Sequence, residues 1–591
     1  MPICKMVLPI AGAAAVHFLT YGAVAQPAEL GAFTVTQVSA MVKLRQTDKA
    51  TASEAGRNAD GIQLWAARGE AESTQLAIHA QQPLNDVRVT SAALSGPEGA
   101  SLRPEVSLVG YVPVKQVLPY AYAEPGDLPD PLLSVAPFSV NAGMTRALWI
   151  TVQVPVDALA GAYAGTVSLE PRGLPKRDVP LAVTVADVTI PARSALHTSV
   201  ASWNGGASKL AYGDLWNAER QAAFREQMLD YRLTSPPPLP WDTVFSKQDG
   251  KWQADWTQFD PAIEAELAKG ATTFRFPVTF RADDRERPDV LPWIGKNPVP
   301  ADVLLGNAAL REDRSAILRL TGEHFTEKNW DQYLQIKIFD EPSVTPASRA
   351  KEGDPGPQNI ENIKAIATYI HNAHPNLRLN FTTTTPYYET VALDFPAYIW
   401  VPHINQFHPG FQLKRQAMGE PNWMYECVTT KWVPKFPDNW RIDRQGTSHR
   451  AIGWWLFRYG CDGYLYWCVD RWSVTNVWEE PAIFKQWPDA AGEGFLFYPN
   501  PDKAAPPLPS IRVELLRDGF EDYDLLILLR EGLSRLEADP QADAQLLERT
   551  RKLLDVEEVI PGKADFCEDP TTYETRHREM LNVLSVIHGG A

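Results

Sequence analysis

The chain has 591 residues and a formal net charge of −16 at pH 7, with 45% hydrophobic residues. This length exceeds what one ordinary core supports and predicts several domains. The excess of acidic residues argues against nucleic acid as a partner, because nucleic-acid binders usually show a clustered basic face. The 19 Trp residues are compatible with stacking on sugar rings, although large cores use Trp as well.

Residues 1–25 have the layout of a cleavable signal peptide. One early cation, Lys5, precedes an apolar run that extends to Val24, and small residues precede Gln26. A membrane anchor is the alternative, but proline and glycine interrupt the run and it ends in small residues. We therefore expect a secreted or periplasmic protein with no membrane insertion after cleavage of the leader.

The mature chain would keep four cysteines in an oxidising compartment: Cys427, Cys461, Cys468 and Cys567. One or two disulfides are compatible with that number, and the pairing stays open. Cys427 and Cys468 lie inside apolar segments, which is typical of buried free thiols. No CxxC or HExxH spacing occurs, so the sequence predicts no metal site and implies no cofactor.

Residues 26–190 predict a β-sandwich accessory domain. Short alternating runs between about Phe33 and Ile190 are separated by Gly, Pro, Asn and Asp turns, a spacing typical of sandwiches. This region contains no helix-length amphipathic stretch and no catalytic motif. Its expected role is packing or contact with carbohydrate.

Residues 191–530 predict a catalytic domain, because strand-like runs now alternate with helical patterns. Eight strand candidates lie at 196–204, 232–239, 272–280, 333–341, 377–385, 397–405, 422–430 and 462–470. Eight alternations predict a (β/α)8 TIM barrel. A doubly wound sheet is the structural alternative, but no glycine-rich phosphate motif follows any strand. The second candidate is the weakest, because Pro236 to Pro238 would interrupt a ladder.

Residues 531–591 predict a C-terminal helical segment. It follows a long helical pattern, SIRVELLRDGFEDYDLLILLREGL, that begins at Ser510 after a proline-rich stretch. These helices are expected to close or flank the barrel.

The most informative motif is QIKIFDEPS at 335–343, where an apolar strand leads into Asp340 and Glu341. Pro342 cannot donate to a ladder, so the strand should end there and leave both acids at its C-terminal edge. In a (β/α)8 barrel that edge carries the active site. Glycoside hydrolysis commonly needs such a carboxylic acid to protonate the leaving oxygen, and Glu341 suits this role. A structural salt bridge at a strand end is the alternative interpretation.

Asp340 and Glu341 can both face a cleft only if the backbone leaves the strand between them, because neighbours in a strand point to opposite faces. Such close acids cannot flank one glycosidic bond as acid and nucleophile, which needs about 5 Å or more between carboxyl groups. A substrate with a 2-acetamido group supplies its own nucleophile, the amide oxygen. The second acid then orients that amide as it closes to an oxazolinium ring.

Three segments resemble glycoside hydrolase family 123 and related sequences: the strand ending FDEP, GWWLFRYGCDGYLYWCVDRW at 453–472, and SIRVELLRDGFEDYDLLILL at 510–529. The resemblance covers about residues 30–550. It implies exo-acting β-N-acetylgalactosaminidase activity on an N-terminal β-sandwich and a (β/α)8 barrel. It also implies substrate-assisted retaining hydrolysis, with Asp340 matching the acid that orients the amide and Glu341 the general acid/base.

Further candidates for substrate binding lie at strand ends: Trp203, Asn204, Arg281, Trp400, His403, Asn405, Tyr425, Glu426, Tyr466, Trp467 and Asp470. A Trp in a barrel strand is more often core than a sugar platform. Tyr466 and Trp467 alternate, so at most one of them points inward. His403 could bind a sugar hydroxyl or serve a structural role.

Two alternatives stay open. Many retaining barrel glycosidases carry Asn-Glu-Pro on the fourth strand and a nucleophilic Glu at the end of the seventh, where Glu426 lies. Asp340 in place of the Asn favours the acetamido-assisted reaction over this double displacement. The other alternative is a non-catalytic carbohydrate-binding protein. The expected partner in every case is a glycan, with a terminal N-acetylhexosamine for the assisted reaction, and a homo-oligomer is compatible with the sequence.

Overall fold

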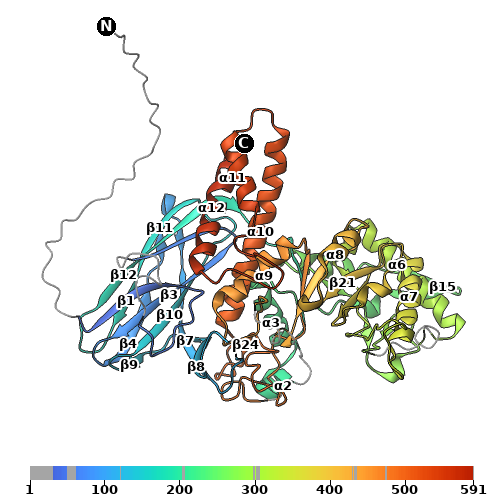
Figure 1. Ribbon diagram of the computed structural model, residues 1–591, viewed down its shortest axis with the longest axis horizontal. Coiled ribbons are helices and arrows are strands. Elements are labelled where there is room, and N and C mark those ends of the chain that lie inside the picture. Colours follow the sequence, from blue (N-terminus) through green and yellow to red (C-terminus); the bar gives the residue numbers. More distant parts are fainter. Residues whose placement is uncertain are drawn as a thin grey trace, which may run out of the picture.

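The computed structural model describes residues 31–49, 61–119, 121–202, 207–296, 306–428, 435–472 and 475–589, together with residues 300 and 430. The predicted signal peptide and two predicted site residues, Trp203 and Asn204, lie outside the described residues. The described chain forms a β-rich N-terminal part, a central part of parallel strands with helices, and a helical C-terminal part (Figure 1).

The N-terminal part consists of two sheets that share one core. The first sheet has the order β1 (Phe33–Ser39), β3 (Ala71–Ala80), β10 (Thr145–Gln153), β7 (Pro104–Val114) and β8 (Gly126–Ser134). The second has the order β2 (Ile62–Arg68), β12 (Arg177–Thr189), β11 (Gly161–Glu170), β4 (Leu84–Ser91) and β9 (Phe138–Val140), with β5 (Leu94–Ser95) and β6 (Ser101–Leu102) beside it. Ile78 of the first sheet and Leu181 of the second lie in the same buried cluster. The predicted β-rich N-terminal region is confirmed.

The central part holds parallel strands: β13 (His197–Val200), β16 (Phe274–Arg275), β19 (Leu334–Gln335), β20 (Leu379–Thr383), β21 (Tyr398–Pro402), β22 (Trp423–Glu426) and β23 (Gly463–Tyr466). Parallel ladders pair β16 with β19, β20 with β21, and β23 with both β22 and β13. Single parallel bridges, Ile336 to Leu379 and Trp400 to Asn422, join these groups. The strands therefore follow one another in the order β16, β19, β20, β21, β22, β23, β13.

The second strand predicted for a closed barrel does not form. Residues 232–239 are all described and contain no strand. Three consecutive prolines remove backbone donors there, and Arg232 has a left-handed φ of 59°. One backbone hydrogen bond, from Val200 N to Thr234 O at 2.9 Å, links this segment to β13. The parallel strands thus form an incomplete barrel wall rather than a complete eight-stranded ladder.

The parallel strands have an outer face that packs on helices and an inner face opposite it. Trp400 lies on the outer face against Phe411 of helix α8 (Pro409–Gln416), and Tyr464 lies there against Phe520 of helix α10 (Ile511–Ala538). Val401, Tyr425 and Leu465 alternate with these side chains and form a separate cluster on the inner face. The inner face is the face toward which a substrate could approach.

The helices are α2 (Ala207–Tyr212), α3 (Ala218–Asp230), α4 (Phe259–Ala268), α6 (Ala308–Glu327), α7 (Gly356–Ala373), α8 (Pro409–Gln416), α9 (Gly446–Arg458), α10 (Ile511–Ala538), α11 (Ala544–Leu554) and α12 (Pro570–Gly589). Three short hairpins or bridged pairs accompany them: β14 (Phe245–Gln248) with β15 (Lys251–Ala254), β17 (Val278–Thr279) with β18 (Leu291–Pro292), and β24 (Phe497–Tyr498) with β25 (Leu508–Pro509). Among the described helices, none combines the length and the apolar character that crossing a bilayer requires.

Helix α10 joins the N-terminal and central parts. The Ser510 hydroxyl caps it by accepting from Val513 N at 3.2 Å. Its Arg512 is buried and donates to Asp130 of β8, and Arg517 donates to Ser73 of β3. Gly519 lets α9 approach closely, because a Cβ there would lie 2.4 Å from Arg450 O. The predicted C-terminal helices are confirmed, and α10 runs across residue 530, where the sequence suggested a boundary.

The four described cysteines, Cys427, Cys461, Cys468 and Cys567, are free thiols. Cys461 and Cys468 are buried, and burial raises the pKa of both thiols well above the ordinary value. They pack as small apolar side chains, as the sequence suggested for Cys468.

Candidate active site

The acid pair lies at the end of the extended segment 336–339, which continues from β19 through isolated bridges at Ile336 and Phe339. Asp340 N still donates to Gly295 O at 3.0 Å, but Glu341 has a left-handed φ of 50°. A side chain other than Gly rarely adopts this conformation, which costs about 1–3 kcal/mol and is common at functional sites. The backbone therefore leaves the extended conformation between the two acids, and both half-buried carboxylates can face one cleft.

Glu341 is held by two donors from distant segments. The Tyr425 hydroxyl of β22 donates to Oε1 at 2.5 Å, and Lys296 Nζ donates to Oε2 at 3.1 Å. The Lys296 side chain is 64% exposed, whereas Tyr425 is buried. Burial and the Glu341 charge raise the pKa of Tyr425 well above its ordinary value, so its hydroxyl stays a proton donor. Burial acts to lower the pKa of Lys296, but Glu341 and Asp340 outweigh it and raise this pKa.

His403 lies behind Tyr425 and stays neutral. Burial lowers the pKa of His403 to about 4 against the opposing effect of Glu341. Its Nδ1 accepts from Asn405 N at 3.2 Å, and its ring lies 5.1 Å from the Tyr425 ring, nearly perpendicular to it. A neutral imidazole in this position fixes Tyr425 by packing rather than by carrying a proton.

Two cations that the sequence analysis did not single out share the inner face with Tyr425. Arg275 ends β16, and Lys337 follows β19 by two residues, three residues before Asp340. Burial lowers the pKa of Arg275 to about 10. Burial and the Arg275 charge lower the pKa of Lys337 to about 8, against the opposing effect of the two acids. Lys337 alternates with apolar Ile336 and Ile338. This alternation is the sequence signal from which a lysine on the inner face could have been predicted.

Three of the predicted residues occupy the outer face. Trp400 is buried and its indole donates to Glu420. Glu426 accepts from Tyr464 Oη at 2.8 Å and from Asn439 N at 2.9 Å. Burial and the charge of Asp438 raise the pKa of Glu426 well above its ordinary value and so favour its protonated form. Tyr466 accepts from Gly494 N at 2.8 Å. Strand alternation therefore separates these side chains from Tyr425 and Glu341.

The remaining predicted residues lie around the ends of the strands. Half-buried Trp467 donates to Glu493, whose pKa burial raises to about 8. Asp470 accepts from Ser202 and Ser208 at 2.6 and 2.8 Å. Arg281 is exposed beyond β17, with its backbone N donating to Thr279. Of the predicted residues that are described, the structure brings together Asp340, Glu341, His403, Asn405 and Tyr425.

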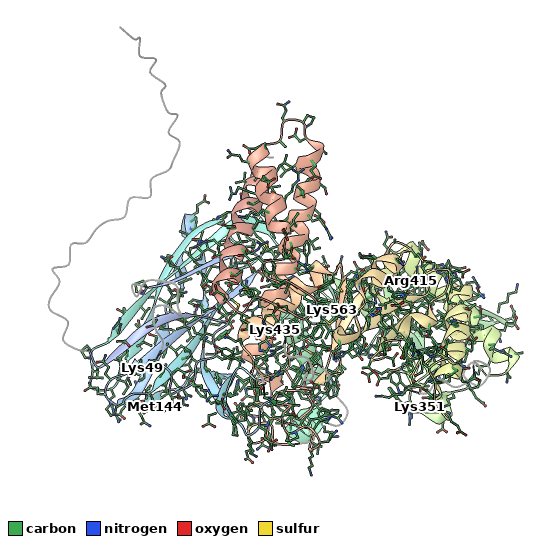
Figure 2. All side chains as sticks on the ribbon, viewed as in Figure 1. Lys49, Met144, Lys351, Arg415, Lys435 and Lys563 are labelled. Carbon is green, nitrogen blue, oxygen red and sulfur yellow. The ribbon has the colours of Figure 1, made fainter. Side chains whose placement is uncertain are left out.

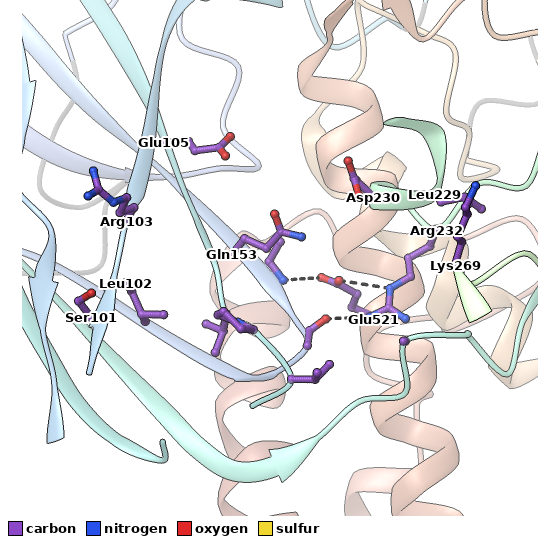
Figure 3. Close-up of a pocket in the computed structure, with 16 residues that line it drawn as sticks. Ser101, Leu102, Arg103, Glu105, Gln153, Leu229, Asp230, Arg232, Lys269 and Glu521 are labelled. Atoms are coloured by element: carbon purple, nitrogen blue, oxygen red, sulfur yellow. Dashed lines mark hydrogen bonds and ion pairs between the residues drawn. The ribbon is translucent and has the colours of Figure 1, made fainter. Parts of the chain in front are cut away.

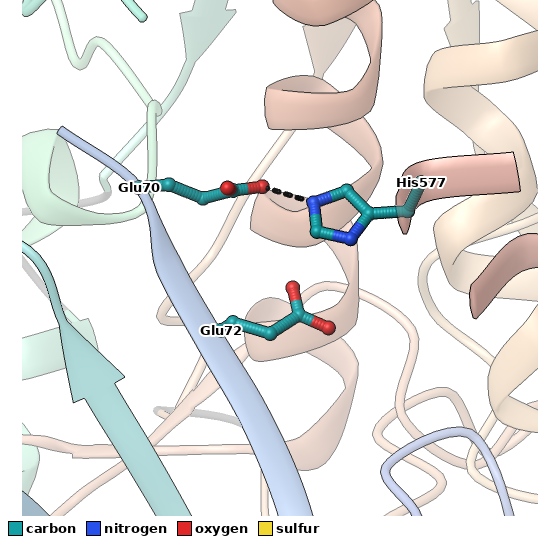
Figure 4. Close-up of side chains that lie close together, drawn as sticks. All are labelled: Glu70, Glu72 and His577. Carbon is teal, nitrogen blue, oxygen red and sulfur yellow. Dashed lines mark hydrogen bonds and ion pairs between the residues drawn. The ribbon is translucent and has the colours of Figure 1, made fainter. Parts of the chain in front are cut away.

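Among the described residues, one group could bring metal-binding atoms together: Glu70, Glu72 and His577, whose atoms lie within 4.8 Å of one another (Figure 4). His577 Nε2 lies 2.7 Å from Glu70 Oε1, and Arg450 Nη1 lies 3.4 Å from Glu72 Oε1. The Glu70 charge outweighs burial and raises the pKa of His577 to about 9. The group is therefore an ion-pair cluster between β3 and α12, with its charges already compensated.

A cavity of about 540 Å³ lies between the N-terminal sheets and α10, apart from the acid pair (Figure 3). Its wall includes Glu105, Gln153, Asp230, Arg232 and Glu521. Arg232 Nε donates to Glu521 at 3.4 Å, and Glu521 also accepts from Ala71 N at 3.3 Å. These hydrogen bonds join the N-terminal part, the central part and α10, and the acids in this cavity wall are separate from Asp340 and Glu341.

Two protein-family models match this chain, and one of them covers the acid pair. The model of the glycoside hydrolase 123 catalytic domain matches residues 239–529, which include Asp340, Glu341 and Tyr425. The model of the glycoside hydrolase 123 N-terminal domain matches residues 45–171. The chain belongs to glycoside hydrolase family 123. The resemblance seen in the FDEP strand and the two C-terminal segments is confirmed.

A solved family 123 glycoside hydrolase from Clostridium perfringens, described in connection with glycolipid glycan hydrolysis, has a similar fold. It is 13% identical, with a TM-score of 0.60 over 94% of this chain and 98% of its own. A Bacteroides ovatus GH5 xyloglucanase is 10% identical, with a TM-score of 0.24 over 78% and 98% of the two chains. A family 39 glycoside hydrolase from Bacteroides cellulosilyticus WH2 is 12% identical, with a TM-score of 0.29 over 77% and 81%. A comparison with curated protein sequences found no match.

Proposed function

We propose that this family 123 protein is a retaining exo-β-N-acetylgalactosaminidase that works by substrate-assisted catalysis through an oxazolinium intermediate. Glu341 is the general acid/base and Asp340 orients the 2-acetamido group. The observation that carries the proposal is the left-handed φ of 50° at Glu341, which breaks the strand alternation that would point the two adjacent acids to opposite faces. Acids this close in the chain cannot straddle a glycosidic bond, so the substrate amide supplies the nucleophile.

The two donors on Glu341 fit an acid that must change its protonation state. Both donors hold the Glu341 carboxyl group in place, and in the second step this group must activate water. Lys296 is exposed and can be displaced by the entering sugar, whereas buried Tyr425 keeps its place.

The position of Glu426 supports this mechanism over double displacement. A nucleophile must be ionised and must face the anomeric carbon. Glu426 lies on the outer face, and burial raises its pKa and so favours its protonated form. Its carboxyl group accepts hydrogen bonds from Tyr464 Oη and Asn439 N. Tyr425, its neighbour on β22, is the residue that reaches Glu341.

We also propose that the central strands complete a (β/α)8 barrel, with residues 232–239 in the place of the missing strand. The parallel order from β16 to β13 and the hydrogen bond from Val200 to Thr234 support this. Export remains a proposal from the sequence, and sequencing the N-terminus of the exported protein should give Gln26 as its first residue.

Hydrolysis of an aryl N-acetyl-β-galactosaminide, compared with the matching aryl β-galactoside, tests the function. We expect turnover of the acetamido sugar alone. Asp340→Asn should lower kcat by about two to three orders of magnitude, the usual scale for one electrostatic stabiliser, and Glu341→Gln should abolish turnover of poor leaving groups. Turnover of the plain galactoside, or full activity of Asp340→Asn, would contradict the assisted mechanism. Binding without turnover would instead favour a carbohydrate-binding protein.

A further inference from the structure

Arg275 and Lys337 form a cationic floor on the inner face, a name used here for these two side chains together. Arg275 pairs with Gln335 in the parallel ladder of β16 and β19, and Lys337 lies two residues further along the same face. The neighbours that alternate with them, Ile336 and Ile338, lie in the outer hydrophobic cluster. Both cations are half-buried, so part of each side chain remains accessible from the inner face.

Arg275 has little to compensate its charge. Its Nη2 donates to Ser199 Oγ at 3.4 Å, a long hydrogen bond to a neutral group. Its Nε is buried and no acceptor in the described part of the chain lies within hydrogen-bond distance. A guanidinium offers five N–H donors, and a buried charge without a partner is costly. Burial lowers the pKa of Arg275 to about 10, in keeping with this lack of acceptors.

Lys337 lies beside this guanidinium. No hydrogen bond or ion pair joins its ammonium group to any of the described residues. The two cations repel each other, and the Arg275 charge contributes to the lowered pKa of Lys337. The charges of Asp340 and Glu341 oppose this lowering of the Lys337 pKa, but no hydrogen bond joins either acid to Lys337 in the described part of the chain.

The cationic floor lies near the acid pair, because the charges of Asp340 and Glu341 both act on Lys337. Ser199, which Arg275 contacts, pairs with Leu465 of β23, and Leu465 pairs with Tyr425 of β22. Tyr425 in turn reaches Glu341 at 2.5 Å. Lys337 precedes Asp340 by three residues, or about 10 Å of strand at about 3.3 Å per residue. The cationic floor is therefore within reach of a substituent on the sugar that binds at the acid pair.

We propose that the terminal N-acetylhexosamine taken by this site carries a sulfate ester, which Arg275 and Lys337 bind. This inference rests on the proposed function and names its substrate class. An anion between the two cations would relieve their repulsion, which a neutral hydroxyl cannot do, and would supply several charged acceptors for Arg275. A sulfate ester is the suitable anion, because an N-acetylhexosamine has hydroxyls that can be sulfated and has no carboxylate of its own.

The test compares 4-nitrophenyl N-acetyl-β-galactosaminide with its 4-sulfate and 6-sulfate on the full chain. We expect kcat/KM for one of the sulfated substrates to exceed that of the unsulfated one by about tenfold or more, the scale of one charge-assisted hydrogen bond. Lys337→Met and Arg275→Gln should remove this preference, and Lys337→Arg should keep it. Lys351→Met removes an exposed cation elsewhere on the central part (Figure 2) and should leave the preference intact.

Two results would overturn the inference: no preference for either sulfated substrate, or a preference that survives in both Lys337→Met and Arg275→Gln. Thermal unfolding of each variant separates loss of binding from loss of folding, and Lys337→Arg supplies a charged variant if Lys337→Met is unfolded.

Calorimetry with inorganic sulfate distinguishes this inference from the proposed function. Sulfate should bind the full chain, and Lys337→Met should weaken that binding about tenfold or more. If sulfate binds in this way but no acetamido sugar is hydrolysed, the proposed function fails and the anion site stands. If the unsulfated sugar is hydrolysed and sulfate neither binds nor improves turnover, the anion site fails and the function stands.

Discussion

Replacing Tyr425 with Phe removes one hydroxyl and keeps the ring that packs against His403. That hydroxyl donates to Glu341 at 2.5 Å, and its partner is the proposed general acid/base. A hydrogen bond to a charged group contributes about 1.5–3 kcal/mol. Tyr425→Phe should therefore lower kcat/KM by about 10- to 150-fold, at about 1.4 kcal/mol for each factor of ten.

Tyr464→Phe is the matched control. Tyr464 donates to Glu426 at 2.8 Å from the neighbouring strand, so the two variants remove the same group from two different acids. Because Glu426 lies on the outer face and burial favours its protonated form, its hydrogen bond should contribute mainly to stability, about 0.5–1.5 kcal/mol. Tyr464→Phe should leave kcat/KM within a few-fold of the unmodified protein.

The assay measures kcat/KM on aryl N-acetyl-β-galactosaminides with good and poor leaving groups, alongside unfolding curves for both variants. The loss in Tyr425→Phe should be larger with the poor leaving group, which needs protonation by Glu341. A larger kinetic loss in Tyr464→Phe than in Tyr425→Phe would refute this reasoning and would support Glu426 as the nucleophile.

Two further predictions concern buried ion pairs between the N-terminal part and the C-terminal helices. Arg512→Met should lower the free energy of unfolding by about 3–5 kcal/mol in denaturant titrations, because it leaves Asp130 buried without its main partner. The control Arg319→Met breaks an exposed ion pair and should change the free energy of unfolding by less than about 1 kcal/mol. Equal effects of the two substitutions would contradict the argument. His577 is stabilised by Glu70 in its protonated form, so its contribution is complete below its ordinary pKa of 6.5 and is lost as pH rises toward about 9. The difference in Tm between the unmodified protein and His577→Gln should therefore shrink from pH 6.5 to above pH 9, and a difference that grows over this range would show that the ion pair is not its source.

The sequence by itself determined the classes of structure and the position of the acids. Alternation and turn residues gave the β-rich N-terminal part, and helical periodicity gave the C-terminal helices. The pair Asp340 and Glu341 followed from an apolar strand that stops at Pro342, because proline cannot extend a ladder. These features depend on neighbours in the chain, so local chemistry is enough to predict them.

Only the tertiary structure decided which side chains accompany the acids. The sequence offered Tyr425 and Glu426 together, and strand alternation places one on each face without saying which face is inner. The helices that cover Trp400 and Tyr464 settle this, because they bury the outer face and leave Tyr425 beside Glu341. Lys296 reaches Glu341 from 45 residues away in the chain. Such contacts come from packing between distant segments, and local periodicity carries no record of that packing.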